Sequence, residues 1–155
     1  MDKKKNFLTI LMRLRNENLF LESFIKHYFA DGVAEIHILD DNSTPPFPDI
    51  VNDESVFIYE ATHFKSHHEK LIDAQMMYEH VLRDKTEWFM FIDADEFITT
   101  RRNSDKTIRE ELETTFKDAD LIKIPWIMFG SNGQDENPKQ ILKDTTWRWN
   151  HDKPH

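Results

Sequence analysis

Residues 88–97 of this chain read WFMFIDADEF, an apolar run that ends in three carboxylates within four residues. Five consecutive large apolar residues predict a strand that is buried on both faces, as in the middle of a parallel sheet. Ligands of open α/β sheets bind at the carboxyl ends of such strands. Asp93, Asp95 and Glu96 therefore follow the strand where we expect a site, and carboxylates this close together favour a cation.

Strands and helices alternate along the rest of the chain. Apolar runs predict strands at residues 7–14, 33–39, 56–59, 88–92 and 121–129, the last with an edge position or a bend at Pro125. Helical spacing predicts a first helix that Asn18 caps, a second over residues 66–83 that begins with a capping box at Ser66, and a third that Ser104 caps. The alternation predicts an α/β fold, a Rossmann-like and mostly parallel sheet flanked by helices.

The composition is that of one ordinary globular domain. The chain has 155 residues, 39% of them hydrophobic and 32% charged, and we interpret residues 1–155 as a single domain. Its formal charge of −9 argues against a nucleic-acid partner, because binding to a phosphate backbone requires a positive surface. For the same reason, an anionic substrate requires a bridging metal ion.

The chain contains no cysteine, so oxygen and imidazole groups are the ligands that remain for a metal. Its basic start and the apolar residues 7–12 resemble a signal peptide, but Arg13 interrupts the run, and we interpret it as the first strand. No apolar run approaches the roughly 20 residues that a membrane-spanning helix needs. We expect no transmembrane segment, and a cytoplasmic protein or one peripheral to a membrane.

The spacing of Asp93 and Asp95 permits two interpretations. In the first, both side chains bind Mn²⁺ or Mg²⁺, hard cations that take oxygen ligands and usually bridge to substrate phosphates. In the second, the residues form a solvated acidic turn. We favour the metal site, because carboxylates crowded at the end of a strand repel one another unless a cation offsets their charge.

Asp40 and Asp41 end the strand at residues 33–39 in the same way. They are candidates to accept hydrogen bonds from a nucleoside, as acidic residues do in dinucleotide-binding folds. The alternative is a plain turn, since Asp, Asn, Ser and Pro are common turn residues. Parallel strands end at one edge of a sheet, so we expect Asp40 and Asp41 to lie near Asp93 and Asp95.

Histidine and tryptophan residues are weaker candidates. His63, His67 and His68 lack a His-Glu-x-x-His pattern, and we expect surface or capping residues rather than zinc ligands. Among the tryptophans, Trp126 is the stronger candidate to stack on a sugar ring, because it precedes the turn at residues 129–133. The alternative is a core position, since aromatic residues often belong to the core. An Asp-x-Asp motif also occurs in haloacid-dehalogenase-type phosphatases, but there it lies near the amino terminus and continues into Thr or Val.

Four segments together resemble the glycosyltransferase family 2-like enzymes of GT-A fold, particularly the branch with an Asn-Glu motif near its start. The segments are Arg15-Asn16-Glu17, Ile38 to Ser43, Trp88 to Phe97, and Ile124 to Gly133. The resemblance as a whole covers most of residues 7–133. Relatives usually continue well beyond the last segment, so the resemblance implies an acceptor-binding portion that is short or truncated after about residue 133.

The resemblance implies a nucleotide-diphosphate sugar as donor, with a UDP-sugar as the first choice, and a carbohydrate or other hydroxyl as acceptor. The residues that it places near the nucleoside are Arg13, Arg15, Glu17, and Asp40 or Asp41. A non-catalytic relative that binds a nucleotide sugar without transferring it is the main alternative.

The resemblance also implies that Asp93 and Asp95 form the Asp-x-Asp motif, which binds the diphosphate through Mn²⁺ or Mg²⁺. Trp126 would then face the sugar or the acceptor. Such enzymes are typically inverting, and a carboxylate base within hydrogen-bond reach deprotonates the acceptor hydroxyl. Asp135 and Glu136 are our candidates for that base.

Overall fold

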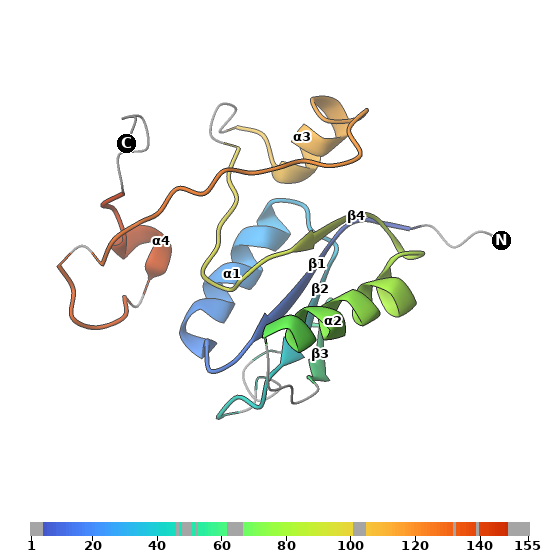
Figure 1. The fold of residues 1–155 in the computed structure, drawn as a ribbon. Coiled ribbons are helices and arrows are strands. Elements are labelled where there is room, and N and C mark those ends of the chain that lie inside the picture. Colours follow the sequence, from blue (N-terminus) through green and yellow to red (C-terminus); the bar gives the residue numbers. More distant parts are fainter. Residues whose placement is uncertain are drawn as a thin grey trace.

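The computed structural model describes residues 5–45, 47, 51, 53–61, 67–100, 105–131, 133–138 and 140–148, and only the backbone of residues 67–70. Within these residues the chain forms an α/β fold around a four-stranded parallel sheet in the order β3-β2-β1-β4 (Figure 1). The strands are β1 (Asn6–Leu14), β2 (Glu35–Asp40), β3 (Val56–Glu60) and β4 (Thr86–Phe91). The predicted fold class is confirmed, and the sheet is consistent with a Rossmann-like GT-A fold.

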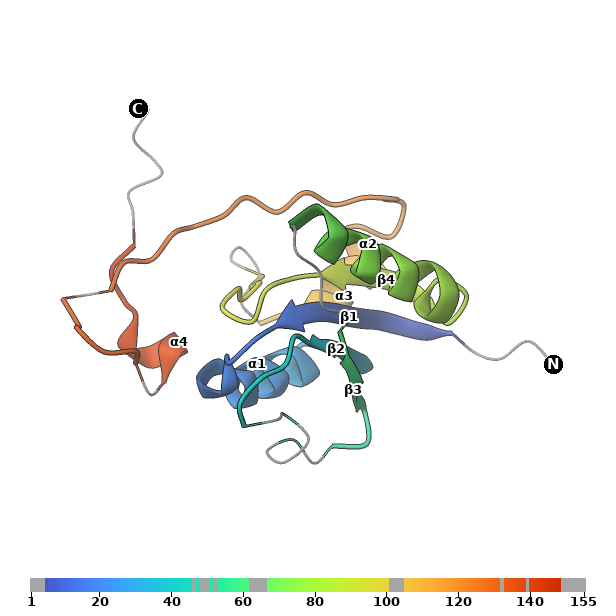
Figure 2. The same ribbon diagram turned by 60° about the horizontal axis from the view of Figure 1, so that its bottom comes forward.

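Helices cover both faces of this sheet. The helices of the described chain are α1 (Asn18–Ala30), α2 (His67–Met77) with its π-helical continuation η2 (Tyr78–Leu82), α3 (Ile108–Thr114) and α4 (Ile141–Asp144), and α4 lies away from the sheet. Figure 2 shows α1 on one face of the sheet and α2 on the other. No described helix is both long enough and apolar enough to cross a membrane.

β1 is buried on both faces, as is β2 beside it. It pairs in parallel with β2 on one side and with β4 on the other. Successive side chains of a strand point to opposite faces, and on one face Ile10 and Met12 pack with Phe24 of α1. On the other face Leu11 packs with Ala74 of α2. Burial of both faces makes β1 the centre of the core.

β4 is an edge strand of the described sheet, so the prediction of a central strand buried on both faces was wrong. Its described pairing is with β1 alone. Trp88, Phe89 and Met90 are half-buried, and Phe91 is 45% exposed. An apolar run reports the hydrophobicity of a strand and not the number of its neighbours, and aromatic side chains keep the run apolar even where one side is open.

Residues 121–128 form no strand, contrary to the prediction for residues 121–129. Pro125 has no N–H to donate to a sheet, and this segment runs from α3 towards α4 without a strand partner among the described residues (Figure 1). Leu121 is consequently 76% exposed. An isolated antiparallel bridge joins the end of the segment, at Phe129, to Arg148.

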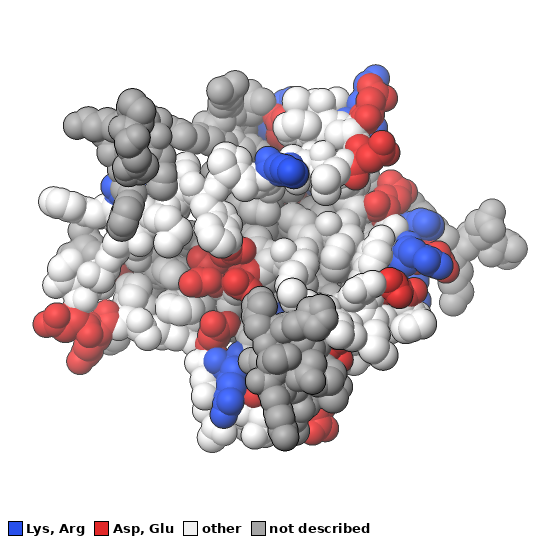
Figure 3. All heavy atoms as spheres, viewed as in Figure 1, with Lys and Arg blue, Asp and Glu red and all other residues white. Residues whose placement is uncertain are grey.

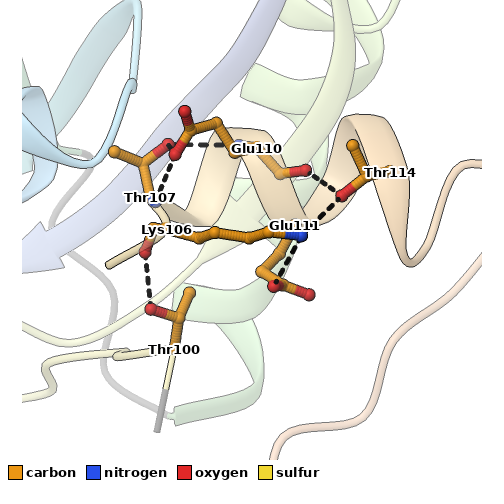
Figure 4. A network of polar contacts seen from close by, with 6 residues as sticks. All are labelled: Thr100, Lys106, Thr107, Glu110, Glu111 and Thr114. Atoms are coloured by element: carbon orange, nitrogen blue, oxygen red, sulfur yellow. Dashed lines mark hydrogen bonds and ion pairs between the residues drawn. The ribbon is translucent and has the colours of Figure 1, made fainter. Parts of the chain in front are cut away.

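The starts of two helices differ from the sequence prediction. Asn18 is the first residue of α1 and not its cap; Glu17 occupies the cap position without a side-chain hydrogen bond. α3 is capped by Thr107, whose hydroxyl accepts from the N–H of Glu110 at 3.1 Å while the Glu110 carboxylate accepts from the N–H of Thr107 at 2.7 Å (Figure 4). The predicted caps Ser66 and Ser104 lie outside the described residues.

Polar contacts around α3 fix the chain that returns from β4. The hydroxyl of Thr100 donates to the carbonyl of Lys106 at 2.6 Å, and the Lys106 ammonium lies 3.6 Å from the Glu111 carboxylate (Figure 4). Gly32, just after α1, has φ +89°, and a Cβ there would lie 2.6 Å from Cβ of Arg109. α1 and α3 therefore approach so closely that only glycine fits at this position.

His37 is a polar side chain buried on the α2 face of the sheet. Its Nε2 lies 3.1 Å from Glu35 Oε2, and its Nδ1 lies 3.1 Å from the hydroxyl of Tyr59. Phe57 and Tyr59 stack on the imidazole ring. Burial lowers the pKa of His37 below its ordinary value of 6.5; Glu35 opposes this shift, and the charge of Lys85 adds to it.

We predict that the protein loses stability as the pH falls below about 6.5, the pKa of histidine in an unfolded chain. In that range unfolded His37 binds a proton and folded His37 does not, so protons favour the unfolded state. The contribution of His37 is complete above the unfolded pKa and declines as the pH falls towards the folded pKa. Urea unfolding at several pH values measures it. His37→Gln should show a shallower decline, and an equal decline in both proteins would contradict the assignment.

Candidate functional site

The carboxyl ends of the strands meet at one edge of the sheet because the strands are parallel. The register aligns Leu14 with Asp40, and Asp40 with Glu60. On one side of β1 the sheet continues with β2 and then β3. β4 lies on the opposite side of β1. Ligands of such sheets bind where the strand order reverses. That point lies between the carboxyl ends of β1 and β4.

The residues after β4 form a tight acidic turn at this edge. The N–H of Glu96 donates to the carbonyl of Asp93 at 3.1 Å, and the Glu96 carboxylate accepts from the N–H of Asp93 at 3.2 Å. Ala94 is fully buried, whereas Asp93 and Asp95 on either side of it are exposed. Glu96 thus closes the turn, and the two aspartates face solvent. Figure 3 shows acidic side chains gathered over this turn.

Tyr28 holds the acidic turn against α1. Its hydroxyl donates to the carbonyl of Glu96 and accepts from the N–H of Ile98, both at 3.0 Å. His27 Nε2 lies 2.8 Å from the Ile98 carbonyl, and the ring of Phe97 stacks on that of Tyr28. Burial raises the pKa of Tyr28 far above its ordinary value, so the hydroxyl stays protonated and serves as donor and acceptor at once.

Glu17 approaches the acidic turn from the loop after β1. Burial raises the pKa of its carboxyl above the ordinary 4.5, and the negative charges of Asp95 and then Asp93 raise it further. Three carboxylates from two loops therefore repel one another at the switch point. In the part of the chain that the structure describes, no three His, Cys, Asp or Glu side chains are grouped closely enough to hold a metal by themselves.

Asn16 joins the loops that follow β1 and β2. Its N–H donates to the hydroxyl oxygen of Ser43 at 2.9 Å, and its side-chain oxygen accepts from the N–H of Thr44 at 2.8 Å. Asn16 has φ +59°, in the left-handed region that Asn tolerates better than most residues. Two reciprocal hydrogen bonds thus fix the loop that carries Glu17 to the loop that carries Asp41.

The two aspartates after β2 have different environments. Asp40 Oδ1 accepts from the N–H of Ser43 at 2.9 Å, so Asp40 stabilises its own turn. Asp41 is buried, and its carboxylate lies 3.2 Å from the guanidinium of Arg13. Arg13 also contacts Asp73 of α2 at 2.9 Å. No pattern in the sequence indicated Asp73, which is one acidic residue of a helix, 60 positions from its partner.

The structure also places the remaining predicted residues. Arg15 is exposed in the loop after β1. Trp126 is 72% exposed, so it does not belong to the core. Asp135 and Glu136 are exposed on the loop before α4. The side chains of the histidines weighed as zinc ligands, His63, His67 and His68, lie outside the described residues.

A family model for glycosyltransferase family 92 matches residues 17–154, which include Glu17, both aspartates of the acidic turn, and α2. The chain belongs to glycosyltransferase family 92. Among curated proteins, none matches it. Membership of family 92 confirms that the chain is a glycosyltransferase in general, as the resemblance implied. The match does not test the family 2-like classification, and the phosphatase alternative receives no support from it.

We predict that Tyr28→Phe destabilises this member of family 92 by about 1–3 kcal/mol, because it leaves the Glu96 carbonyl and the Ile98 N–H without their buried partner. Amide hydrogen exchange and urea unfolding measure the effect, and Ile98 should lose protection. Tyr59→Phe is the matched control, since that hydroxyl contacts His37 and not the acidic turn. Unchanged protection of Ile98 in Tyr28→Phe would show that Tyr28 does not hold the turn.

Proposed function

We propose that the protein is a metal-dependent glycosyltransferase of GT-A type, which transfers a sugar from a nucleoside-diphosphate sugar to a hydroxyl of a carbohydrate acceptor. A UDP-sugar is the donor we favour. The observation that carries the proposal is that the loop of Glu17 after β1 and the turn of Asp93 and Asp95 after β4 follow neighbouring parallel strands at the switch point of the sheet. Membership of family 92 supports glycosyl transfer in general.

The carboxylate ligands at the acidic turn suit a divalent cation whose coordination is completed by oxygens of the substrate. Asp93 and Asp95 supply two exposed carboxylates from one turn. Mg²⁺ usually binds through one or two carboxylates together with substrate phosphates, and rarely in a site made of protein alone. The lack of a third close ligand among the described residues fits this mode. A bound cation supplies neutralising charge for the departing nucleoside diphosphate.

The residues of the neighbouring loops bind and orient the donor in this proposal. Asp41 accepts a hydrogen bond from the nucleoside at the end of β2, where burial and Arg13 hold its carboxylate in place. Arg15, exposed on the loop after β1, pairs with the diphosphate. Glu17, from the same loop, adds negative charge beside Asp93 and Asp95, which strengthens the attraction for a cation.

We assign the acceptor side to the segments after α3. Trp126 is exposed and presents a large aromatic surface to a sugar ring. Asp135 or Glu136 acts as the base that deprotonates the acceptor hydroxyl, and the transfer inverts the configuration of the sugar, as in family 2-like enzymes. Both acids are exposed, so a polysaccharide or a smaller carbohydrate can reach them without opening of the core.

We predict that UDP raises the melting temperature of the protein only when Mn²⁺ or Mg²⁺ is present. A ligand at about 100 times its Kd stabilises the native state by about 2.7 kcal/mol. Asp95→Asn should abolish the metal-dependent part of the shift, because it removes one of the two charged ligands. Glu87→Gln is the matched control, since it removes one charge from an exposed position of β4 away from the turn.

Full metal-dependent stabilisation of Asp95→Asn would show that the cation binds elsewhere. Hydrolysis or transfer of a UDP-sugar by the Mn²⁺-loaded protein then separates the enzyme from its main alternative. Binding of UDP without any turnover would favour a non-catalytic relative that retains the donor site.

A further inference from the structure

A buried network of charges connects α2 to the donor edge of the sheet. Arg13, near the carboxyl end of β1, contacts Asp41 after β2 through Nη2 at 3.2 Å and Asp73 of α2 through Nη1 at 2.9 Å. The exposed fractions of the three side chains are 8%, 12% and 16% in that order. Three elements distant in sequence thus meet in one polar contact beside the residues that we assign to the donor.

The chemistry of the guanidinium makes this contact directional. Arg presents its N–H groups in a rigid planar fork, so the position of one carboxylate restricts the position of the other. Arg13 also lies on β1, whose backbone is held by strands on both sides. Asp73 therefore fixes the rotation of the guanidinium, and the guanidinium in turn fixes Oδ2 of Asp41.

The carboxylate of Asp41 suits a hydrogen-bond donor better than an anion. Carboxylate oxygens accept hydrogen bonds. Hydroxyl and N–H groups of a nucleoside can donate to them, whereas a diphosphate offers acceptors of the same charge.

We propose that Asp73 is a positioning residue for nucleoside recognition, acting through Arg13 on the carboxylate of Asp41. This inference rests on the proposed function, because it takes Asp41 as a nucleoside ligand. It adds α2 to the parts of the chain that determine donor affinity. A purely structural network would instead attach α2 to the sheet with no preference between nucleoside and phosphate.

The experiment compares the Kd of UDP with that of inorganic pyrophosphate, both with Mn²⁺, by titration calorimetry. Pyrophosphate reports the acidic turn and Arg15, and UDP reports these residues together with Asp41. Asp73→Asn should weaken UDP binding by about tenfold, the loss expected when one charge-assisted hydrogen bond is misaligned. It should leave pyrophosphate binding unchanged, and Asp73→Glu should restore part of the UDP affinity. Asp84→Asn, an exposed acid after η2, is the matched control and should change neither value.

A double-mutant cycle decides whether Asp73 acts through Asp41. The variant with both Asp41→Asn and Asp73→Asn should bind UDP no more weakly than Asp41→Asn alone, because the group that Asp73 positions is already altered. Additive losses, or an equal loss of UDP and pyrophosphate in Asp73→Asn, would overturn the inference while leaving the donor site in place. Failure of the unaltered protein to bind either compound would overturn the proposed function and the inference with it.

Discussion

Parallel pairing of β1 with both β2 and β4 is the constraint on which the rest of the structure depends. It brings the ends of three strands, and the loops that follow them, to one edge of the sheet. The strand order reverses beside β1, and ligands of open α/β sheets bind at such a reversal, here between the loops after β1 and β4. Asp93, Asp95 and Glu17 flank this point because of topology, although two of them are more than 70 residues from the third.

Specific contacts from α1 and the loops oppose the repulsion between these carboxylates. Tyr28 fixes the backbone on the far side of the acidic turn, and Asn16 fixes the loop of Glu17 to the loop after β2. Like charges that are held together in this way destabilise one another, and they raise the pKa of Glu17. The arrangement resembles a preorganised site, in which the protein holds the charged ligands in position before the ligand arrives.

Local sequence patterns predicted the parts of this account that depend on local chemistry. The strands, the acidic turn at Asp93 and the common edge with Asp41 followed from apolar runs that end in acids. The edge position of β4 could not be predicted in this way, because the packing of the whole chain determines which strands pair with it. The contact of Arg13 with Asp73 could not be predicted either, because only the packing of α2 on the sheet creates it. The predicted strand at residues 121–129 failed for the same reason, since a strand requires a partner as well as an apolar run.

The most direct test of a cation shared between the acidic turn and a donor diphosphate is a crystal structure of the protein with UDP and Mn²⁺, with anomalous scattering used to locate the metal. We predict one manganese peak in contact with carboxylate oxygens of Asp93 or Asp95 and with the diphosphate, and the nucleoside beside Asp41. UDP bound at this edge with manganese elsewhere, or bound away from the carboxyl ends of β1 and β4, would contradict the account.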